Sequence, residues 1–96
     1  MIVHIVMLKF KEEEKASNIK KIKIELNALV EKIAELKSME VGIDFNQSPR
    51  AFDLSLYSTF QNKEDLNAYA VHPAHLEVVA LIKSVTSESK VVDYVL

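Results

Sequence analysis

Two histidines and a tyrosine lie within a short stretch of the second half of the chain. Tyr69, His72 and His75 surround Pro73 in the segment Tyr-Ala-Val-His-Pro-Ala-His. An imidazole can take up or release a proton near neutral pH, and a phenol can donate a hydrogen bond to a developing oxyanion. The segment therefore contains the side chains that general acid–base chemistry requires.

Pro73 decides how the local backbone presents these groups. A proline has no amide hydrogen and clashes with the preceding turn, so it costs ~3 kcal/mol inside a helix but suits the first position of one. We therefore expect one helix to stop near Val71 and another to begin at Pro73, with His72 as its cap. Tyr69 then ends the first helix and His75 opens the second, so the two side chains can converge on a common cavity, with His4 at its floor.

His4 and Tyr57 complete the set of candidate site residues. His4 has apolar neighbours in a strand-like segment, where a histidine is often a hydrogen-bonded core residue. Tyr57 stands on the polar side of another strand-like segment, which could wall a polar cavity or face solvent. We predict a catalytic pair, His75 and Tyr69, and three substrate-binding residues, His4, His72 and Tyr57. Purely structural roles for His4 and Tyr69 are the alternative.

The composition limits the class of protein. The 96 residues suffice for one domain, residues 1–96, and the 49% hydrophobic and 27% charged residues are ordinary globular values. The formal net charge is −2 without a basic cluster, so no nucleic acid partner is expected. The chain has no cysteine, and no apolar run approaches the ~20 residues of a membrane span. We expect a cytoplasmic protein without membrane association.

A metal site is not expected either. The chain has three histidines, but His72 and His75 straddle Pro73 and lack the i, i+4 spacing of a chelating pair on one helix. We predict neither a metal nor any other cofactor.

The first strand-like segment, residues 2–10, carries apolar side chains on both faces. Val3, Ile5 and Met7 alternate with His4, Val6, Leu8 and Phe10. Helices of a small domain can cover only one face of its sheet, so a second copy of the chain is the expected cover for the other. This pattern predicts a homodimer formed through the sheet faces.

The rest of the chain alternates helical and strand patterns. A long amphipathic helix is expected from an N-cap at Ser17 to about Leu36, then a strand over 39–45. We expect a bulge at Gly42 in this strand, and a ligand contact at this glycine is the alternative. A strand over 52–60 places Phe52, Leu54, Leu56 and Phe60 on one face and Asp53, Ser55, Tyr57 and Thr59 on the other. Asn62 begins the broken helix, and a last strand covers 91–96. The order βαββαβ predicts an α+β, ferredoxin-like fold with a four-stranded antiparallel sheet.

The whole chain resembles the stress-responsive dimeric α/β-barrel (Dabb) family. The resemblance rests on four segments: residues 2–11, Val41-Gly42 with Ser48-Pro-Arg50 and 52–56, residues 69–79, and residues 91–94. The His-Pro-Ala-His segment is the most specific of them. The resemblance implies a dimeric α/β barrel in which the sheets of two protomers pack face to face.

The family resemblance leaves two functions open. Family members include stress-induced proteins of unsettled biochemistry, which implies a homodimer that binds a small apolar or aromatic molecule in a barrel pocket. They also include plant polyketide cyclases, whose aldol chemistry implies His75 as base and Tyr69 as oxyanion donor, with His4 lining the pocket. Leu26 stands where those cyclases bring a further tyrosine. Haem-degrading and cofactor-free monooxygenases share the barrel, but the chain has no tryptophan or cysteine.

Overall fold

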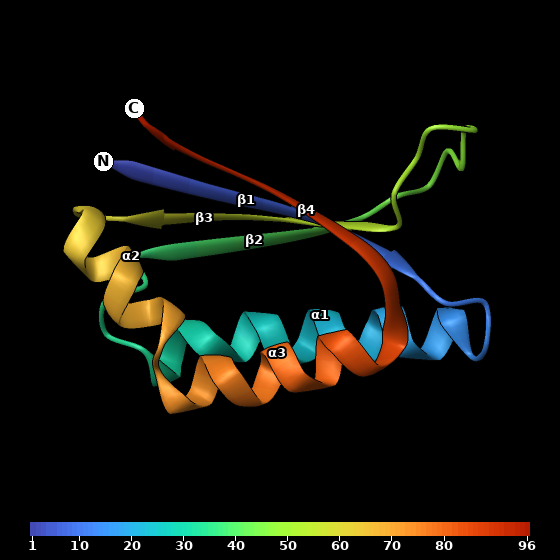
Figure 1. Ribbon diagram of the computed structural model, residues 1–96, viewed down its shortest axis with the longest axis horizontal. Helices are drawn as coiled ribbons and strands as arrows, with labels where there is room; N and C mark the ends of the chain where they lie inside the picture. The colour runs from blue at the N-terminus through green and yellow to red at the C-terminus, as the bar shows by residue number, and fades with distance from the viewer.

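The computed structural model describes residues 1–96. The elements in chain order are β1 (Ile2–Phe10), α1 (Lys15–Lys32), β2 (Ser38–Ile43), β3 (Leu54–Phe60), α2 (Lys63–Ala70), α3 (Pro73–Val85) and β4 (Thr86–Val95). The four strands form one antiparallel sheet in the order β2-β3-β1-β4, and the helices lie on one side of it (Figure 1). The predicted ferredoxin-like fold is confirmed. No helix combines the length and hydrophobicity that a membrane span needs.

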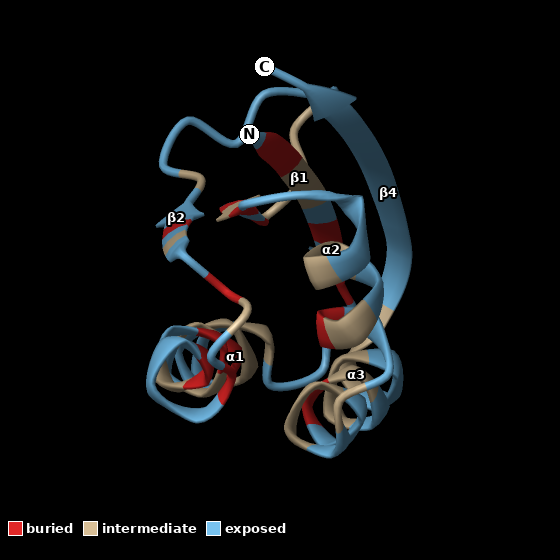
Figure 2. Ribbon diagram, turned by 90° about the vertical axis from the view of Figure 1, so that its left-hand side faces the viewer, coloured by how far each residue is buried: buried red, intermediate tan, exposed pale blue.

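The core lies between the sheet and the helices. The apolar stripe of α1 and Val78 of α3 pack against buried apolar side chains of β1 and β3. Figure 2 marks the buried residues on these elements. Each large apolar side chain buried here contributes about 1.5–3 kcal/mol relative to an exposed one. The fully buried members include Leu8, Ile22, Leu26, Leu29, Ile33, Leu54 and Phe60.

The face of the sheet away from the helices, which we call the open face, carries large apolar side chains. Ile5 lies between its cross-strand partners Tyr57 and Val92, and Met7 and Tyr94 extend the apolar surface. Met7 is 41% exposed and Val92 is 52% exposed. Partial burial, together with the neighbouring Tyr57 phenol, raises the pKa of Tyr94. Contiguous apolar surface of this kind is typical of an interaction face.

Helix α1 differs from the sequence prediction at both ends. It begins at Lys15, so the predicted N-cap at Ser17 is wrong. Glu14 adopts a left-handed conformation with φ 51°, and the Ser17 hydroxyl donates to the Glu14 carbonyl at 3.0 Å from within the first turn. The helix ends at Lys32, although the following Ile33 is extended and still fully buried. The apolar spacing that predicted a helix to Leu36 therefore marked residues that are buried, but the last of them lie beyond the end of the helix.

The strands differ in their limits and in the position of the bulge. The predicted bulge at Gly42 is wrong, because Gly42 pairs with Ser55 in an unbroken β2–β3 register. The irregularity lies instead between Lys9 and Phe10, where β1 pairs with β4. Strand β2 ends at Ile43, β3 begins two residues later than expected, and β4 begins at Thr86, directly after α3. Phe52 and Asp53 thus precede β3, so they do not take part in the alternation of faces that was predicted for residues 52–60.

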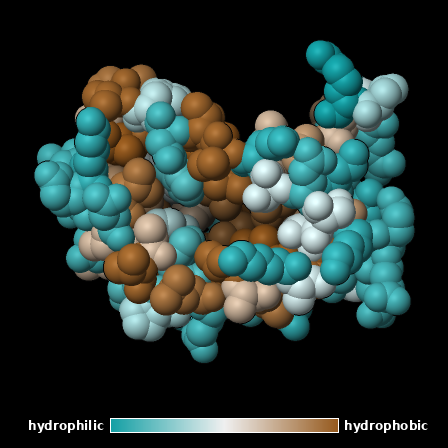
Figure 3. Space-filling view, in the orientation of Figure 1, coloured by the Kyte–Doolittle hydropathy of each residue, from teal (hydrophilic) through white to brown (hydrophobic).

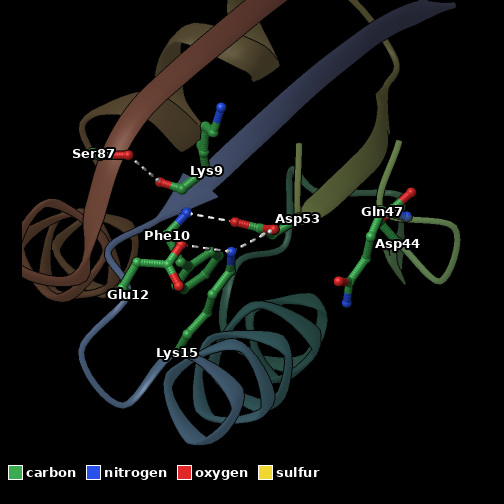
Figure 4. Close-up of polar contacts among 8 residues, drawn as sticks. All are labelled: Lys9, Phe10, Glu12, Lys15, Asp44, Gln47, Asp53 and Ser87. Atoms are coloured by element: carbon green, nitrogen blue, oxygen red, sulfur yellow. Dashed lines mark hydrogen bonds and ion pairs between the residues drawn. The ribbon is translucent and has the colours of Figure 1, made fainter. Parts of the chain in front are cut away.

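Asp53 ties three elements together near the start of α1 (Figure 4). One of its carboxylate oxygens accepts a hydrogen bond from the Phe10 amide at 2.7 Å, and the other lies 3.3 Å from the Lys15 Nζ. The hydrogen bond to Asp53 and its negative charge raise the pKa of Lys15, with a smaller contribution from Glu12. The predicted position of Asp53 on the polar face with Ser55 is therefore wrong.

Candidate functional site

The helix break at Pro73 positions the predicted site residues. Helix α2 ends at Ala70 and α3 begins at Pro73, as the sequence predicted. His72 is the N-cap of α3, where its Nδ1 accepts a hydrogen bond from the Ala74 amide at 3.0 Å. A neutral imidazole that accepts at Nδ1 carries its hydrogen on Nε2. His72 is therefore fixed at the joint mainly by its capping role.

His75 has the opposite arrangement. Its Nδ1 lies 3.0 Å from the Ala70 carbonyl oxygen, which can only accept, so Nδ1 carries the hydrogen and donates. The Nε2 lone pair remains without a protein partner. Burial lowers the pKa of His75, and the nearby His4 and His72 act in the same direction, whereas the bond to Ala70 opposes the shift. A neutral imidazole with a free Nε2 is the form that a general base requires.

Tyr69 packs directly against His75. Their ring centroids are 4.2 Å apart with planes inclined by 39°, and the Phe60 ring lies 5.0 Å from Tyr69 on the sheet. Tyr69 is only 1% exposed, and burial raises its pKa to about 12. Its hydroxyl has no protein partner, yet no fully buried side-chain polar atom is left unpaired. The exposed part of Tyr69 is therefore its hydroxyl, which stays protonated at neutral pH.

His4 completes an aromatic cluster that we define as His4, Phe60, Tyr69 and His75. The His4 ring lies 6.3 Å from Tyr69 and 6.4 Å from Phe60, both with edge-to-face geometry. Its Nδ1 contacts the Asp93 carboxylate, and the Ser58 hydroxyl donates to its backbone carbonyl. The sequence predicted that Tyr69 and His75 face a common cavity with His4 at its floor. The structure brings the three rings together, whereas the shared cavity stays a prediction.

Asp93 is a residue of this site that the sequence analysis missed. It pairs with His4 in the β1–β4 register, and its carboxylate holds the His4 ring by Nδ1, which leaves Nε2 free. The signal was the alternation of the last strand combined with its antiparallel pairing to β1. A carboxylate that fixes the tautomer and orientation of a histidine is a recurrent feature of acid–base sites.

Tyr57 does not join the aromatic cluster. It pairs with Ile5 and Glu40 on the open face, whereas the His4 ring packs with Tyr69 on the helix side. The sheet therefore separates Tyr57 from the other predicted substrate-binding residues. No group of three or more His, Cys, Asp or Glu side chains is arranged to hold a metal ion.

A hollow of about 430 Å³ lies between α2 and β4, and none of the four side chains of the aromatic cluster lines it. Leu66 and Asn67 of α2 line one side, and Asp93, Tyr94 and Val95 of β4 line the other. Apolar surface continues from the end of the molecule that holds both termini into a central depression (Figure 3). Asp93 contacts both this hollow and His4, so it links the open space to the aromatic cluster.

The sequence of residues 2–96 matches the model of the family described as Stress responsive A/B Barrel Domain, or Dabb. The chain belongs to this family. The At5g22580 stress-response A/B barrel domain-containing protein of Arabidopsis thaliana is 33% identical over 94 residues, which are 95% of this chain and 82% of that protein. DABB1 of the same organism is 27% identical over 104 residues, covering 99% of this chain but 47% of DABB1. The Dabb chain described here thus spans about half the length of DABB1.

Solved structures share the fold. A dimeric protein of unknown function with a ferredoxin-like fold from Bacteroides fragilis superposes with a TM-score of 0.88 at 31% identity, covering 97% of this chain and 93% of that one. Hydroxynitrile lyase from Passiflora edulis superposes with a TM-score of 0.87 at 23% identity, covering 99% and 92% of the two chains. The second likeness concerns the fold alone. Several of these neighbours are described as dimeric.

Proposed function

We propose that this Dabb protein is a homodimer that binds a small apolar or aromatic molecule against Tyr69 and His75. The observation that carries the proposal is the contact between the two rings, which lie 4.2 Å apart in a tilted arrangement and each keep one unpartnered polar atom. Aromatic rings supply apolar contact area, and an unpaired Nε2 and hydroxyl supply orientation. The hollow between α2 and β4 provides space for a ligand on the side of His4 where Asp93 lies.

The dimer in this proposal forms through the open faces of two sheets. Ile5, Met7 and Val92 would be covered in such a pair, which removes from water side chains that one chain cannot bury. Structural neighbours that are described as dimeric support a homodimer. The absence of cysteine supports a cytoplasmic location, and the family's name supports a role in the stress response.

A second function, proton transfer of the aldol type, is supported by the opposite pKa shifts of the pair. His75, neutral and free at Nε2, would take a proton from a carbon next to a carbonyl. Tyr69, whose pKa is raised to about 12 and which is therefore protonated, would donate a hydrogen bond to the oxyanion that develops. Asp93 would bind the His4 ring at Nδ1 and leave its Nε2 as a further polar group near the pair.

Binding is tested with 2-naphthol, an apolar bicyclic probe with one hydroxyl. We expect 2-naphthol to shift the ring NMR signals of His75 and Tyr69, and His75→Ala to remove the binding. His72→Ala is the matched control, because His72 uses its Nδ1 for capping and should not affect affinity. Unchanged 2-naphthol binding in His75→Ala would contradict this ligand site. Proton exchange at the carbon next to the carbonyl of acetophenone, followed in heavy water, tests the second function with the same variants.

The dimer is tested by light scattering. A single chain has a mass of 10.9 kDa, and we expect twice that mass at micromolar concentration. Ile5→Glu places a charge in the middle of the open face and should yield the monomer, whereas Ile24→Glu on the exposed side of α1 should not. A monomeric wild-type protein would contradict the proposed assembly.

A further inference from the structure

Phe45 is the most exposed large apolar side chain of the protein. It lies near the start of the connection between β2 and β3, residues 44–53, and is 93% exposed. A scattered apolar side chain on a surface needs no explanation by itself. Phe45 calls for one because the loop that carries it is fixed and lies on the side of the open face.

Hydrogen bonds hold the connection on both sides of Phe45. The Asp44 amide donates to the Asp53 carbonyl at 2.9 Å, and the Asp53 amide donates to the Leu8 carbonyl of β1, also at 2.9 Å. The Gln47 amide donates to the Asp44 carboxylate at 2.7 Å. These bonds fix the backbone around Phe45, so its ring is held in solvent and has no contact that buries it within its own chain.

The connection rises above the sheet on the side away from the helices (Figure 1). Two sheets that pack face to face lie ~10 Å apart. The connection has ten residues between the end of β2 and the start of β3, and half of that length can span up to about 16 Å. The loop can therefore reach a second sheet that covers the open face.

A hollow of about 420 Å³ lies on the open face beside this connection. It is lined by Met7 of β1, Gly42 of β2 and Ser55 of β3, and by Phe52 of the connection. Gly42 is the only glycine in the chain, has no positive φ and pairs regularly with Ser55, so the backbone does not require a glycine there. The missing side chain keeps the floor of the hollow open.

We propose that the Phe45 ring of each chain inserts into this hollow of a second copy, over Gly42 and between Met7 and Phe52. This inference rests on the proposed homodimer and names the contact that fixes its geometry. In a two-fold pair every contact occurs twice, so one ring and one hollow on the same face give two insertions.

The insertion also sets the direction of the two-fold axis. Phe45 and the hollow both lie at the end of the sheet where β2 joins β3. A ring that enters the matching hollow of the second copy therefore brings both connections to the same end of the dimer. The axis then runs along the strands.

The first test is the dissociation constant of the dimer, measured by sedimentation of an N-terminally labelled chain at nanomolar to micromolar concentration. Phe45→Ala should raise this constant tenfold or more, because each dimer loses two inserted rings. Leu76→Ala is the matched control. It removes an apolar side chain of α3 that is 52% exposed on the helix side, so it should leave the dissociation constant unchanged.

The second test fills the hollow. A Cβ at position 42 would meet only the Ser55 Oγ, at 3.8 Å, so Gly42→Leu can fold, and circular dichroism checks that it does. Gly42→Leu should weaken the wild-type dimer about tenfold but should cause no further loss in Phe45→Ala, because no ring then competes for the hollow.

The outcomes separate this contact from the homodimer itself. A monomeric wild-type protein would overturn both. A wild-type dimer whose dissociation constant is unchanged by Phe45→Ala would overturn the insertion and leave the homodimer standing. Additive losses from Gly42→Leu and Phe45→Ala would also overturn it, because the two positions would then act independently.

Discussion

Polar side chains between the sheet and the helices are fully hydrogen-bonded at one end of the sheet and partly unpaired at the other. At one end, Asp53 uses one oxygen for the Phe10 amide and the other for Lys15. At the other end, His75 and Tyr69 each keep one polar atom without a protein partner, although the Tyr69 ring is buried and the His75 ring is half-buried against it. Paired groups of the first kind stabilise the fold, whereas unpaired groups of the second kind are available to a ligand. The difference separates a structural cluster from a candidate site in the same small domain.

The largest expected effect comes from breaking the paired end. Asp53→Ala leaves the Phe10 amide without its acceptor, and Phe10 is buried, so we expect the free energy of unfolding to fall by about 2 kcal/mol. Urea unfolding measures the change. Lys15→Met is the control, and it should cost less than about 1 kcal/mol because the ion pair is partly exposed. Equal losses in the two variants would assign the stabilisation to the ion pair instead of the backbone bond.

His72 and His75 show the same contrast within four residues, because His72 has a structural role as a helix cap and His75 keeps a free nitrogen. His72→Ala removes a helix cap and should lower the free energy of unfolding by about 1 kcal/mol, because the Ala74 amide loses its acceptor. The affinity for 2-naphthol should stay the same. Thermal unfolding with and without 2-naphthol separates the two readouts, and a loss of ligand stabilisation in His72→Ala would show that His72 belongs to the site.

The pH dependence of stability sharpens the assignment of His75. Its pKa in the folded protein is lowered by burial from 6.5, so the unfolded chain binds more protons between the two values. The contribution of His75 is therefore complete above pH 6.5 and is lost as the pH falls toward the lowered pKa. Urea unfolding at a series of pH values should give a flatter profile for His75→Gln than for the wild type. Identical profiles would contradict the buried, neutral imidazole.

The smallest expected effect is that of Tyr69→Phe. The Tyr69 hydroxyl has no protein partner, so its removal should change the free energy of unfolding by less than about 0.5 kcal/mol. The same variant should remove the tyrosine ionisation expected near a pH of about 12 in ultraviolet absorbance. A large loss of stability would indicate that the hydroxyl is bonded within the protein and is unavailable to a ligand.

Much of the fold could be predicted because its signals are local. Pro73 fixed the helix break, Asn62 fixed the start of α2, and the apolar faces of residues 2–10 indicated a sheet needing two covers. The start of α1 was missed because a left-handed Glu14, not a capping side chain, begins the helix. The bulge predicted at Gly42 is wrong because a glycine in a strand pattern does not distinguish a bulge from a regularly paired position.

The site could be predicted only in part, because half of it depends on pairing between distant strands. Tyr69 and His75 are close in sequence and could be placed together. Asp93 reaches His4 only through the register of β4 on β1, and Tyr57 is separated from both by the sheet. The alternation within one strand shows which residues share a face, but it does not show which face the helices cover.

The most direct measurement is the tautomeric state of the histidine rings by long-range nitrogen–proton NMR at neutral pH. We expect His72 to carry its hydrogen on Nε2 and His75 to carry its hydrogen on Nδ1, because the first accepts from the Ala74 amide and the second donates to the Ala70 carbonyl. Addition of 2-naphthol should then shift the His75 Nε2 signal and leave His72 unchanged. The same tautomer in both rings, or a ligand shift centred on His72, would contradict the claim that His75 offers a free base beside Tyr69.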